Sequence, residues 1–97
     1  MTRSEGEQLL GAARDVFRVR YSQTENLDEA TRLFQAEVRK GDFDGKYYGI
    51  VDEVKHLDDG RIQLKTSNHD DKLEVGVIRF NLEDGRSEVE WFNRDPD

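Results

Sequence analysis

The sequence contains no cysteine and only one proline in 97 residues. Without cysteine the chain forms no disulfide and offers neither a thiolate nucleophile nor a thiolate ligand for a metal. Nothing in the composition indicates an oxidising compartment, so we expect a cytoplasmic protein. The first residues include acids and no apolar stretch of signal-peptide length, and no window approaches the roughly 20 apolar residues of a membrane-spanning helix. We therefore expect no contact with a membrane.

Hydrophobic residues are scarce, at 34%, whereas charged residues reach 38%. Such a balance raises the question of disorder, because a polar chain can fail to bury enough apolar surface to offset its ordering entropy. Leu, Ile, Val and Phe nevertheless form about a quarter of the chain, above the roughly 20% that is typical of disordered sequences. A chain of this length holds one core. The sequence therefore predicts a single small, soluble domain over residues 1–97.

The acidic charge is confined to the second half of the chain. Residues 1–40 carry seven basic and seven acidic side chains, so the net charge of −7 arises entirely from residues 41–97. A surface of this sign repels nucleic acid and attracts basic proteins, most strongly at low salt. We expect a protein partner of basic character and no direct binding to nucleic acid.

Residues 1–40 have the apolar spacing of two amphipathic helices. Large apolar side chains recur at intervals of three and four residues, first from Leu9 onward and then from Leu27 onward. A polar run separates the two patterns. The sequence predicts helices over about 4–21 and 26–40.

The expected helix ends carry recognisable capping residues. Ser4 and Glu7 have the spacing of a capping box, and Asn26 and Glu29 repeat that spacing. Gly41 is typical of a helix C-terminus, because glycine adopts the left-handed conformation that often ends a helix. We expect one helix to begin at Ser4 and the other to begin at Asn26 and stop before Gly41.

Beyond residue 41 the pattern changes to that of β-strands. Runs rich in Val, Ile and aromatic residues predict four strands, over about 46–56, 61–66, 73–82 and 87–92. Two of the three connections contain Asp-Gly, a strong hairpin signal that is typical of a type I′ turn. We expect an α+β fold in which two N-terminal helices pack on one face of a curved four-stranded antiparallel meander.

The third expected strand does not alternate regularly. Val75 and Val77 fall on one face, whereas Ile78 and Phe80 fall on the other. A β-bulge near Gly76 would turn both sets inward and bend the sheet.

The connectivity of the meander brings acidic residues together. Both Asp-Gly turns fall at one end of the sheet, and the longer polar connection falls at the other. Four carboxylates should therefore gather at the turn end, where they suit a basic partner: Asp58, Asp59, Glu83 and Asp84.

Two aromatic pairs complete the candidate binding residues: Tyr47, Tyr48, Trp91 and Phe92. Adjacent strand residues point to opposite faces, so one ring of each pair cannot enter the helix-covered core. In an open sheet the outer rings lie on separate edges. If the sheet curls toward closure they converge into a patch that suits a partner or a second copy of the chain.

The sequence offers no metal site or catalytic constellation. The run from Asp42 to Gly45 resembles part of a calcium loop, but Lys40 and Val51 occupy the positions of the first and twelfth ligands. His69 adjoins two aspartates, yet no further ligand accompanies it. No serine has the setting of a nucleophile, and no glycine run resembles a phosphate-binding loop. We expect no metal, no cofactor and no enzymatic activity.

The leading hypothesis is a non-enzymatic protein-binding or regulatory module that acts through its acidic sheet ends and outer aromatics. One alternative is an acidic mimic of nucleic acid that inhibits a DNA-processing enzyme. In element order the chain also resembles nuclear transport factor 2-like and cystatin-like proteins, a resemblance that implies a small-ligand pocket lined by residues such as Tyr21, Tyr48, Arg79 and Trp91. A weaker resemblance of residues 45–49 to the opening strand of SH3-like or Tudor-like barrels implies a closed sheet that binds a peptide.

Overall fold

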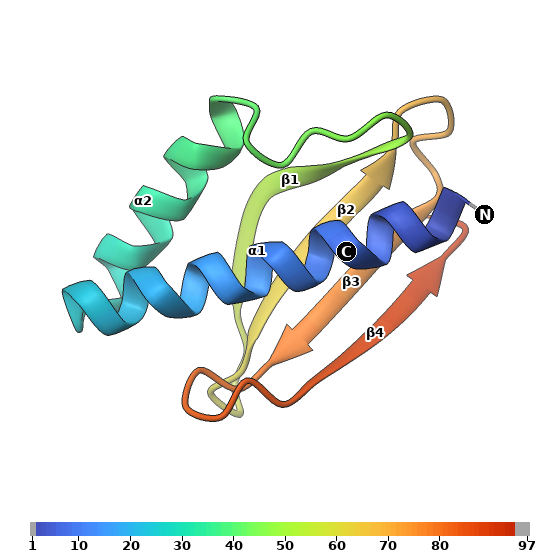
Figure 1. Ribbon diagram of the computed structural model, residues 1–97. Helices are drawn as coiled ribbons and strands as arrows, with labels where there is room; N and C mark the ends of the chain where they lie inside the picture. The colour runs from blue at the N-terminus through green and yellow to red at the C-terminus, as the bar shows by residue number, and fades with distance from the viewer. Residues whose placement is uncertain (1, 95–97) are drawn as a thin grey trace.

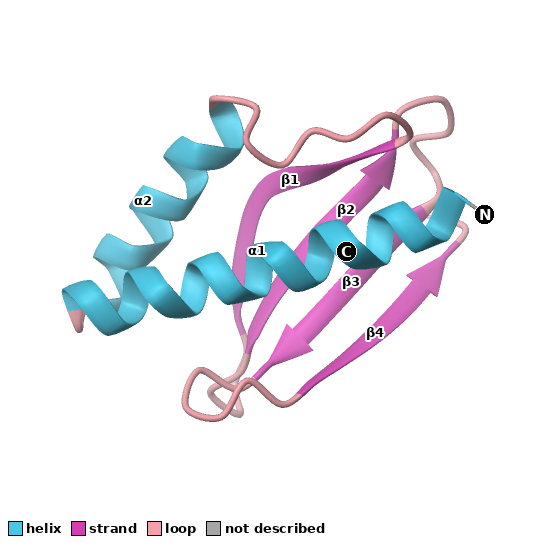
Figure 2. Ribbon diagram, viewed as in Figure 1, coloured by secondary structure: helices cyan, strands magenta, loops and turns pink. Residues whose placement is uncertain are grey.

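Two helices lie over one face of an antiparallel sheet in the computed structural model, which describes residues 2–94 (Figures 1 and 2). The elements follow in the order α1 (Thr2–Thr24), α2 (Leu27–Arg39), β1 (Tyr48–His56), β2 (Ile62–Asn68), β3 (Val75–Phe80) and β4 (Ser87–Phe92). Each strand pairs antiparallel with the next, in the order β1-β2-β3-β4. The predicted α+β meander is confirmed. The sheet is open, so the barrel alternative is wrong.

One hydrophobic core joins the helices to the sheet. The ring of Phe17 in α1 lies 5.6 Å from that of Phe34 in α2 and 6.0 Å from that of Phe80 in β3. Phe34 also contacts Phe43, in the connection between α2 and β1. Edge-to-face aromatic contacts of this kind stabilise a core beyond the area that they bury. The core consists of Leu10, Ala13, Phe17, Ala30, Phe34, Phe43, Ile50, Ile62, Leu64, Ile78 and Phe80.

Helix α2 lies within one residue of its predicted bounds at each end, with Asn26 and Lys40 as its caps. The side chain of Asn26 accepts a hydrogen bond of 2.9 Å from the backbone N–H of Glu29, which satisfies one unpaired donor of the first turn. Beyond Arg39 the chain turns at Gly41, whose φ of +91° is the left-handed conformation of a helix end. Asn26 is thus confirmed as the N-cap, whereas the full capping box is not formed, because the N–H of Asn26 donates to Thr24 and Glu29 accepts from Arg32.

Helix α1 begins earlier than predicted, and its expected capping box is wrong. Since the helix already begins at Thr2, Ser4 lies within it. The carboxylate of Glu5 instead accepts three backbone N–H groups at the approach to β1, at distances of 3.1 and 2.7 Å from Lys46 and Tyr47 before the strand and 2.8 Å from Tyr48, its first residue. These hydrogen bonds, that of Tyr47 foremost, hold the pKa of Glu5 below its usual value. The first turn of α1 is thus tied to the sheet.

The sheet is irregular in β1, not in β3 as predicted. Pairing of β3 with both neighbours runs without interruption through Gly76, so the expected bulge is wrong. In β1, by contrast, Ile50 pairs with Thr66 and Val54 pairs with Leu64. The stretch of β1 between these two pairs therefore contains more residues than the facing stretch of β2. Because the number of extra residues is even, Ile50 and Val54 stay on the same side of the sheet, facing the helices.

The apolar pattern of β3 has a different cause from a bulge. Ile78 and Phe80 point into the core beneath the helices. Val75 and Val77, on the opposite face, are 2% and 0% exposed. Because both faces of β3 are buried, the strand needs apolar residues on both, and a regular strand accounts for the sequence.

Both hairpin turns lie at one end of the sheet, and the β2–β3 connection lies at the other (Figure 1). Gly60 and Gly85 adopt φ of +90° and +74°, whereas neither Asp59 nor Asp84 has a positive φ. The type I′ turn predicted from Asp-Gly is therefore wrong, although the hairpins themselves are confirmed. In the first hairpin the N–H of Gly60 donates to the carbonyl of Leu57, so Asp58 and Asp59 are the central residues of the turn. Gly60 follows them and is the residue that takes the left-handed conformation.

Candidate protein-binding surface

The two edges of the sheet differ in how their main chains are covered. On β1 the N–H of Ile50 donates to the carbonyl of Phe43 at 3.0 Å, and the side-chain amide of Gln35 donates to the carbonyl of Asp52 at 2.8 Å. The connection after α2 and α2 itself thus occupy this edge at Ile50 and Asp52. Over this stretch β1 cannot pair with another strand.

Within residues 2–94, the outer edge of β4 has no such cover. A hydrogen bond from the N–H of Asn81 to the carbonyl of Arg86 closes the β3–β4 hairpin. Since hydrogen-bonded and non-hydrogen-bonded pairs alternate, the register puts Ser87, Val89 and Trp91 in non-hydrogen-bonded pairs. Their N–H and C=O groups point away from β3, and within residues 2–94 no loop or side chain bonds to them. β4 therefore presents a row of open donors and acceptors.

Helix α1 contacts the inner side of β4 near both ends of the strand. Arg14 donates from Nη1 to the hydroxyl oxygen of Ser87 at 2.9 Å. The indole Nε1 of Trp91 donates to the carboxylate of Glu7 at 3.1 Å. These contacts fix the position of the strand while leaving its outer edge open.

Val89 lies between these two contacts and is 40% exposed. Both contacts are made at the ends of the strand, and its centre stays open to solvent. The inner side of β4 thus carries one exposed apolar residue in its centre.

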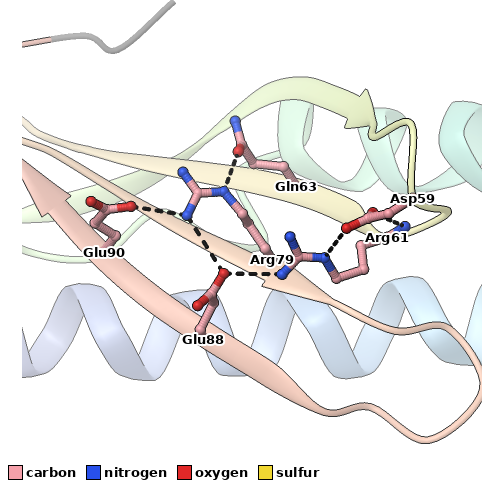
Figure 3. Close-up of polar contacts among 6 residues, drawn as sticks. All are labelled: Asp59, Arg61, Gln63, Arg79, Glu88 and Glu90. Carbon is pink, nitrogen blue, oxygen red and sulfur yellow. Dashed lines mark hydrogen bonds and ion pairs between the residues drawn. The ribbon is translucent and has the colours of Figure 1, made fainter.

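The outer side of β4 carries Glu88 and Glu90, which join a network of arginines (Figure 3). Oε1 of Glu88 accepts a hydrogen bond from Arg61 at 3.0 Å and lies 3.8 Å from Nη1 of Arg79. Oε1 of Glu90 accepts from the same Nη1 of Arg79 at 2.9 Å, and Gln63 accepts from Nε of Arg79. In the described part of the chain, Oε2 of each glutamate has no partner. Each glutamate can therefore accept a further donor.

The four turn acids gather at one end of the sheet, but arginines lie among them. Asp59 accepts from Nε of Arg61 at 2.8 Å, and the backbone N–H of Arg61, followed by its guanidinium, holds the pKa of Asp59 below its usual value. Arg86 lies 3.7 Å from Asp84. Arg18 donates to the main-chain carbonyl of Glu83 at 3.0 Å, while Asp58 stays exposed. The turn end is consequently of mixed charge.

The four candidate aromatics do not form one surface. Tyr48 is fully buried, and its ring meets that of Trp91 at 5.4 Å on the helix side of the sheet. Tyr47 is 40% exposed and Phe92 is half-buried, and no ring contact joins them within residues 2–94. In this open sheet Tyr47 and Phe92 are separate aromatics.

Trp91 fits between two glycines that sequence reasoning did not single out together. A Cβ atom on Gly6 of α1 would lie 2.7 Å from the indole, and one on Gly76 of β3 would lie 2.9 Å from it. The guanidinium of Arg3 lies 4.9 Å from the centre of the indole ring. The absence of two side chains thus makes room for the ring that anchors β4 beneath α1.

A cleft of about 300 Å³ lies beside the C-terminal end of α2. Arg39, Phe43, Ile50, His69 and Lys72 contribute to its lining. Nε2 of His69 lies within 3.0 Å of a carbonyl and a carboxylate in the connection after α2, so this imidazole holds two loops together. Among the described residues, no three acidic or histidine side chains group closely enough to hold a metal.

The pocket that the sequence suggested is not formed. Tyr48 and Trp91 pack against each other on the helix side of the sheet, whereas Arg79 lies in the network on the outer face. Residues on opposite faces of a sheet cannot line one cavity.

The candidate surface, called the β4 edge, consists of the open main-chain edge of β4 together with Glu88, Val89 and Glu90. Sequence reasoning placed binding residues at both ends of β4 but missed its middle, although the alternation of Glu88, Val89 and Glu90 is visible in the sequence.

Within residues 2–94, no helix combines the length and apolar character required to cross a bilayer. No protein-family model, curated protein or solved structure matches this chain.

Proposed function

We propose that this chain is a non-enzymatic protein-binding module and that a segment of its partner adds to the β4 edge as a fifth strand. The observation that carries the proposal is the row of outward main-chain groups on Ser87, Val89 and Trp91. Strand addition of this kind draws its affinity from main-chain hydrogen bonds and its specificity from alternate side chains. The other edge of the sheet is already occupied at Ile50 and Asp52.

The β4 edge also connects the two features that the sequence assigned to binding. It begins just after the acidic turn of Glu83 and Asp84 and ends at Trp91 and Phe92. A partner strand lying along it would pass both. With a net charge of −7 on the chain, a basic partner is favoured.

The alternative of a nucleic-acid mimic has less support. A mimic needs carboxylates that replace phosphates and are free to meet a basic groove. At the turn end, Asp59 and Asp84 already face Arg61 and Arg86. The arginines reduce the local negative charge that mimicry requires.

The test uses the purified chain as bait in an extract of the source organism, with two variants at one position. Val89→Pro removes an N–H that points away from β3 and leaves the β3–β4 ladder in place. Val89→Thr retains that N–H and serves as the matched control. We expect a protein that the wild type and Val89→Thr retain and that Val89→Pro loses.

Retention of the same proteins by Val89→Pro would contradict the proposal. Circular dichroism and thermal unfolding of the three baits serve to check that they are equally folded, so that a loss of binding reports on the edge alone.

A further inference from the structure

We infer that the segment that binds the β4 edge is an extended strand with a basic, an apolar and a basic residue in succession. This inference rests on the proposed function and specifies its partner. Three consecutive residues of β4 carry it, because Glu88 and Glu90 lie on the outer side and Val89 lies on the inner side.

The two glutamates determine the charge of the partner. Their side chains are 59% and 53% exposed, and each already accepts an arginine of this chain through Oε1. An added strand would place its own side chains directly opposite, about 5 Å away between Cβ atoms. Lysine or arginine there would meet the unoccupied Oε2 atoms, and each carboxylate would then lie between two cations.

Val89 determines the middle position. The side chain opposite it would lie on the same, inner side of the sheet. Val89 is 40% exposed, so an apolar side chain there would meet apolar surface. An apolar residue would cover surface that α1 leaves open.

A second copy of this chain fits the same edge poorly. Antiparallel pairing centred on Val89 would set Glu88 of each copy opposite Glu90 of the other. Like charges directly opposite destabilise a strand pair. A basic segment removes this repulsion and adds attraction.

The test is a titration of the full chain with three blocked peptides, followed by backbone amide chemical shifts. The peptides are Thr-Thr-Xaa-Val-Xaa-Thr-Thr, in which both Xaa residues are Lys, Thr or Glu. We expect the lysine peptide to shift the amides of residues 87–92 and to bind about tenfold more tightly than the threonine peptide. Its affinity should fall as sodium chloride rises, because exposed charge pairs are screened.

Two double variants assign the preference to the edge. Glu88→Gln with Glu90→Gln keeps an oxygen for each arginine but removes two charges, and should abolish the tenfold preference for lysine. Asp28→Asn with Asp42→Asn makes the same change in net charge at exposed positions near the two ends of α2, and should retain the preference.

The possible outcomes distinguish the inferred charge of the partner from strand addition itself. Equal binding of the lysine and threonine peptides at β4 would overturn the inference about charge and leave strand addition intact. Absence of amide shifts in β4 with all three peptides would overturn strand addition itself. A doubling of the mass of the free chain in sedimentation, with β4 at the interface, would show that a second copy is the occupant and would also overturn the inference.

Discussion

At the scale of single residues, the position of β4 depends on two glycines, because their lack of a side chain leaves room for the indole of Trp91. Gly6 and Gly76 lie on either side of Trp91, from α1 and from β3. A sequence shows where its glycines are, but not that two of them, 70 residues apart, face the same ring. The pairing of Tyr48 with Trp91 escaped prediction for the same reason, because it depends on the curvature of the whole sheet.

We expect Gly6→Ala to lower the free energy of unfolding by about 1–3 kcal/mol, because the new methyl group overlaps the indole of Trp91. Gly11→Ala in the same helix is the control. A Cβ there meets nothing closer than 3.9 Å, so helix propensity alone should stabilise the protein by about 0.5–1 kcal/mol. Urea unfolding measures both. A Gly6→Ala variant as stable as Gly11→Ala would disprove the packing of Trp91 described here.

Glu5 and Glu74 link the start of α1 to the sheet, and both have a lowered pKa. The backbone N–H groups at the start of β1 lower that of Glu5. Arg3 foremost, then Asn68, lowers the pKa of Glu74. A carboxylate with a lowered pKa in the folded state stabilises the fold above its usual pKa of 4.5, and this contribution is lost as the pH falls through the lowered value.

We therefore expect the free energy of unfolding to fall as the solution is acidified below about pH 4.5. Glu5→Gln should reduce stability at neutral pH and make the fall on acidification shallower, because the amide has no proton to gain. Urea unfolding at a series of pH values measures both effects. Parallel curves for the wild type and Glu5→Gln would argue against the three-donor arrangement at Glu5.

At the scale of elements, the sequence predicted those helix ends and turns that depend only on residues close together in the chain. The start of α2 at Asn26, its end before Gly41 and the two hairpins are set within a few residues of the chain. The turn type and the bulge were wrong because several conformations satisfy the same local sequence. In β3 the pattern of Val75 to Phe80 came from burial of both faces, which depends on the rest of the molecule.

Replacing the cap of α2 tests the simplest of these local signals. We expect Asn26→Ala to destabilise the protein by about 1 kcal/mol, because the N–H of Glu29 loses its acceptor. Asn26→Ser keeps an acceptor and should cost much less. Thermal unfolding compares the two variants, and equal stability of Asn26→Ala and the wild type would show that the cap is dispensable.

The stability of two proline variants separately tests the direction of the main-chain groups in β4. Glu90→Pro removes an N–H that belongs to the β3 ladder, whereas Val89→Pro removes one that points outward. We expect Glu90→Pro to cost about 1–3 kcal/mol more than Val89→Pro in urea unfolding. The reverse order would mean that the two residues point the other way and that the proposed binding edge is misassigned.

At the scale of the whole molecule, the sequence predicted net charge and fold class but not which edge of the sheet is open. The connection after α2 reaches across to β1, where Phe43 enters the core and its carbonyl accepts the N–H of Ile50. Among the described residues near β4 in the sequence, none makes an equivalent contact. The open edge is therefore a consequence of tertiary packing. So is the contact of Arg18 in α1 with the turn end, which the sequence does not reveal.

Amide hydrogen exchange across β4 in the free protein tests the open edge most directly. The amides of Glu88 and Glu90 belong to the β3 ladder and should exchange slowly, whereas those of Ser87, Val89 and Trp91 should exchange much faster. Such an alternation along the strand is the result that we predict. Uniformly slow exchange over residues 87–91 would show that the edge is already occupied and would contradict its assignment as the binding surface.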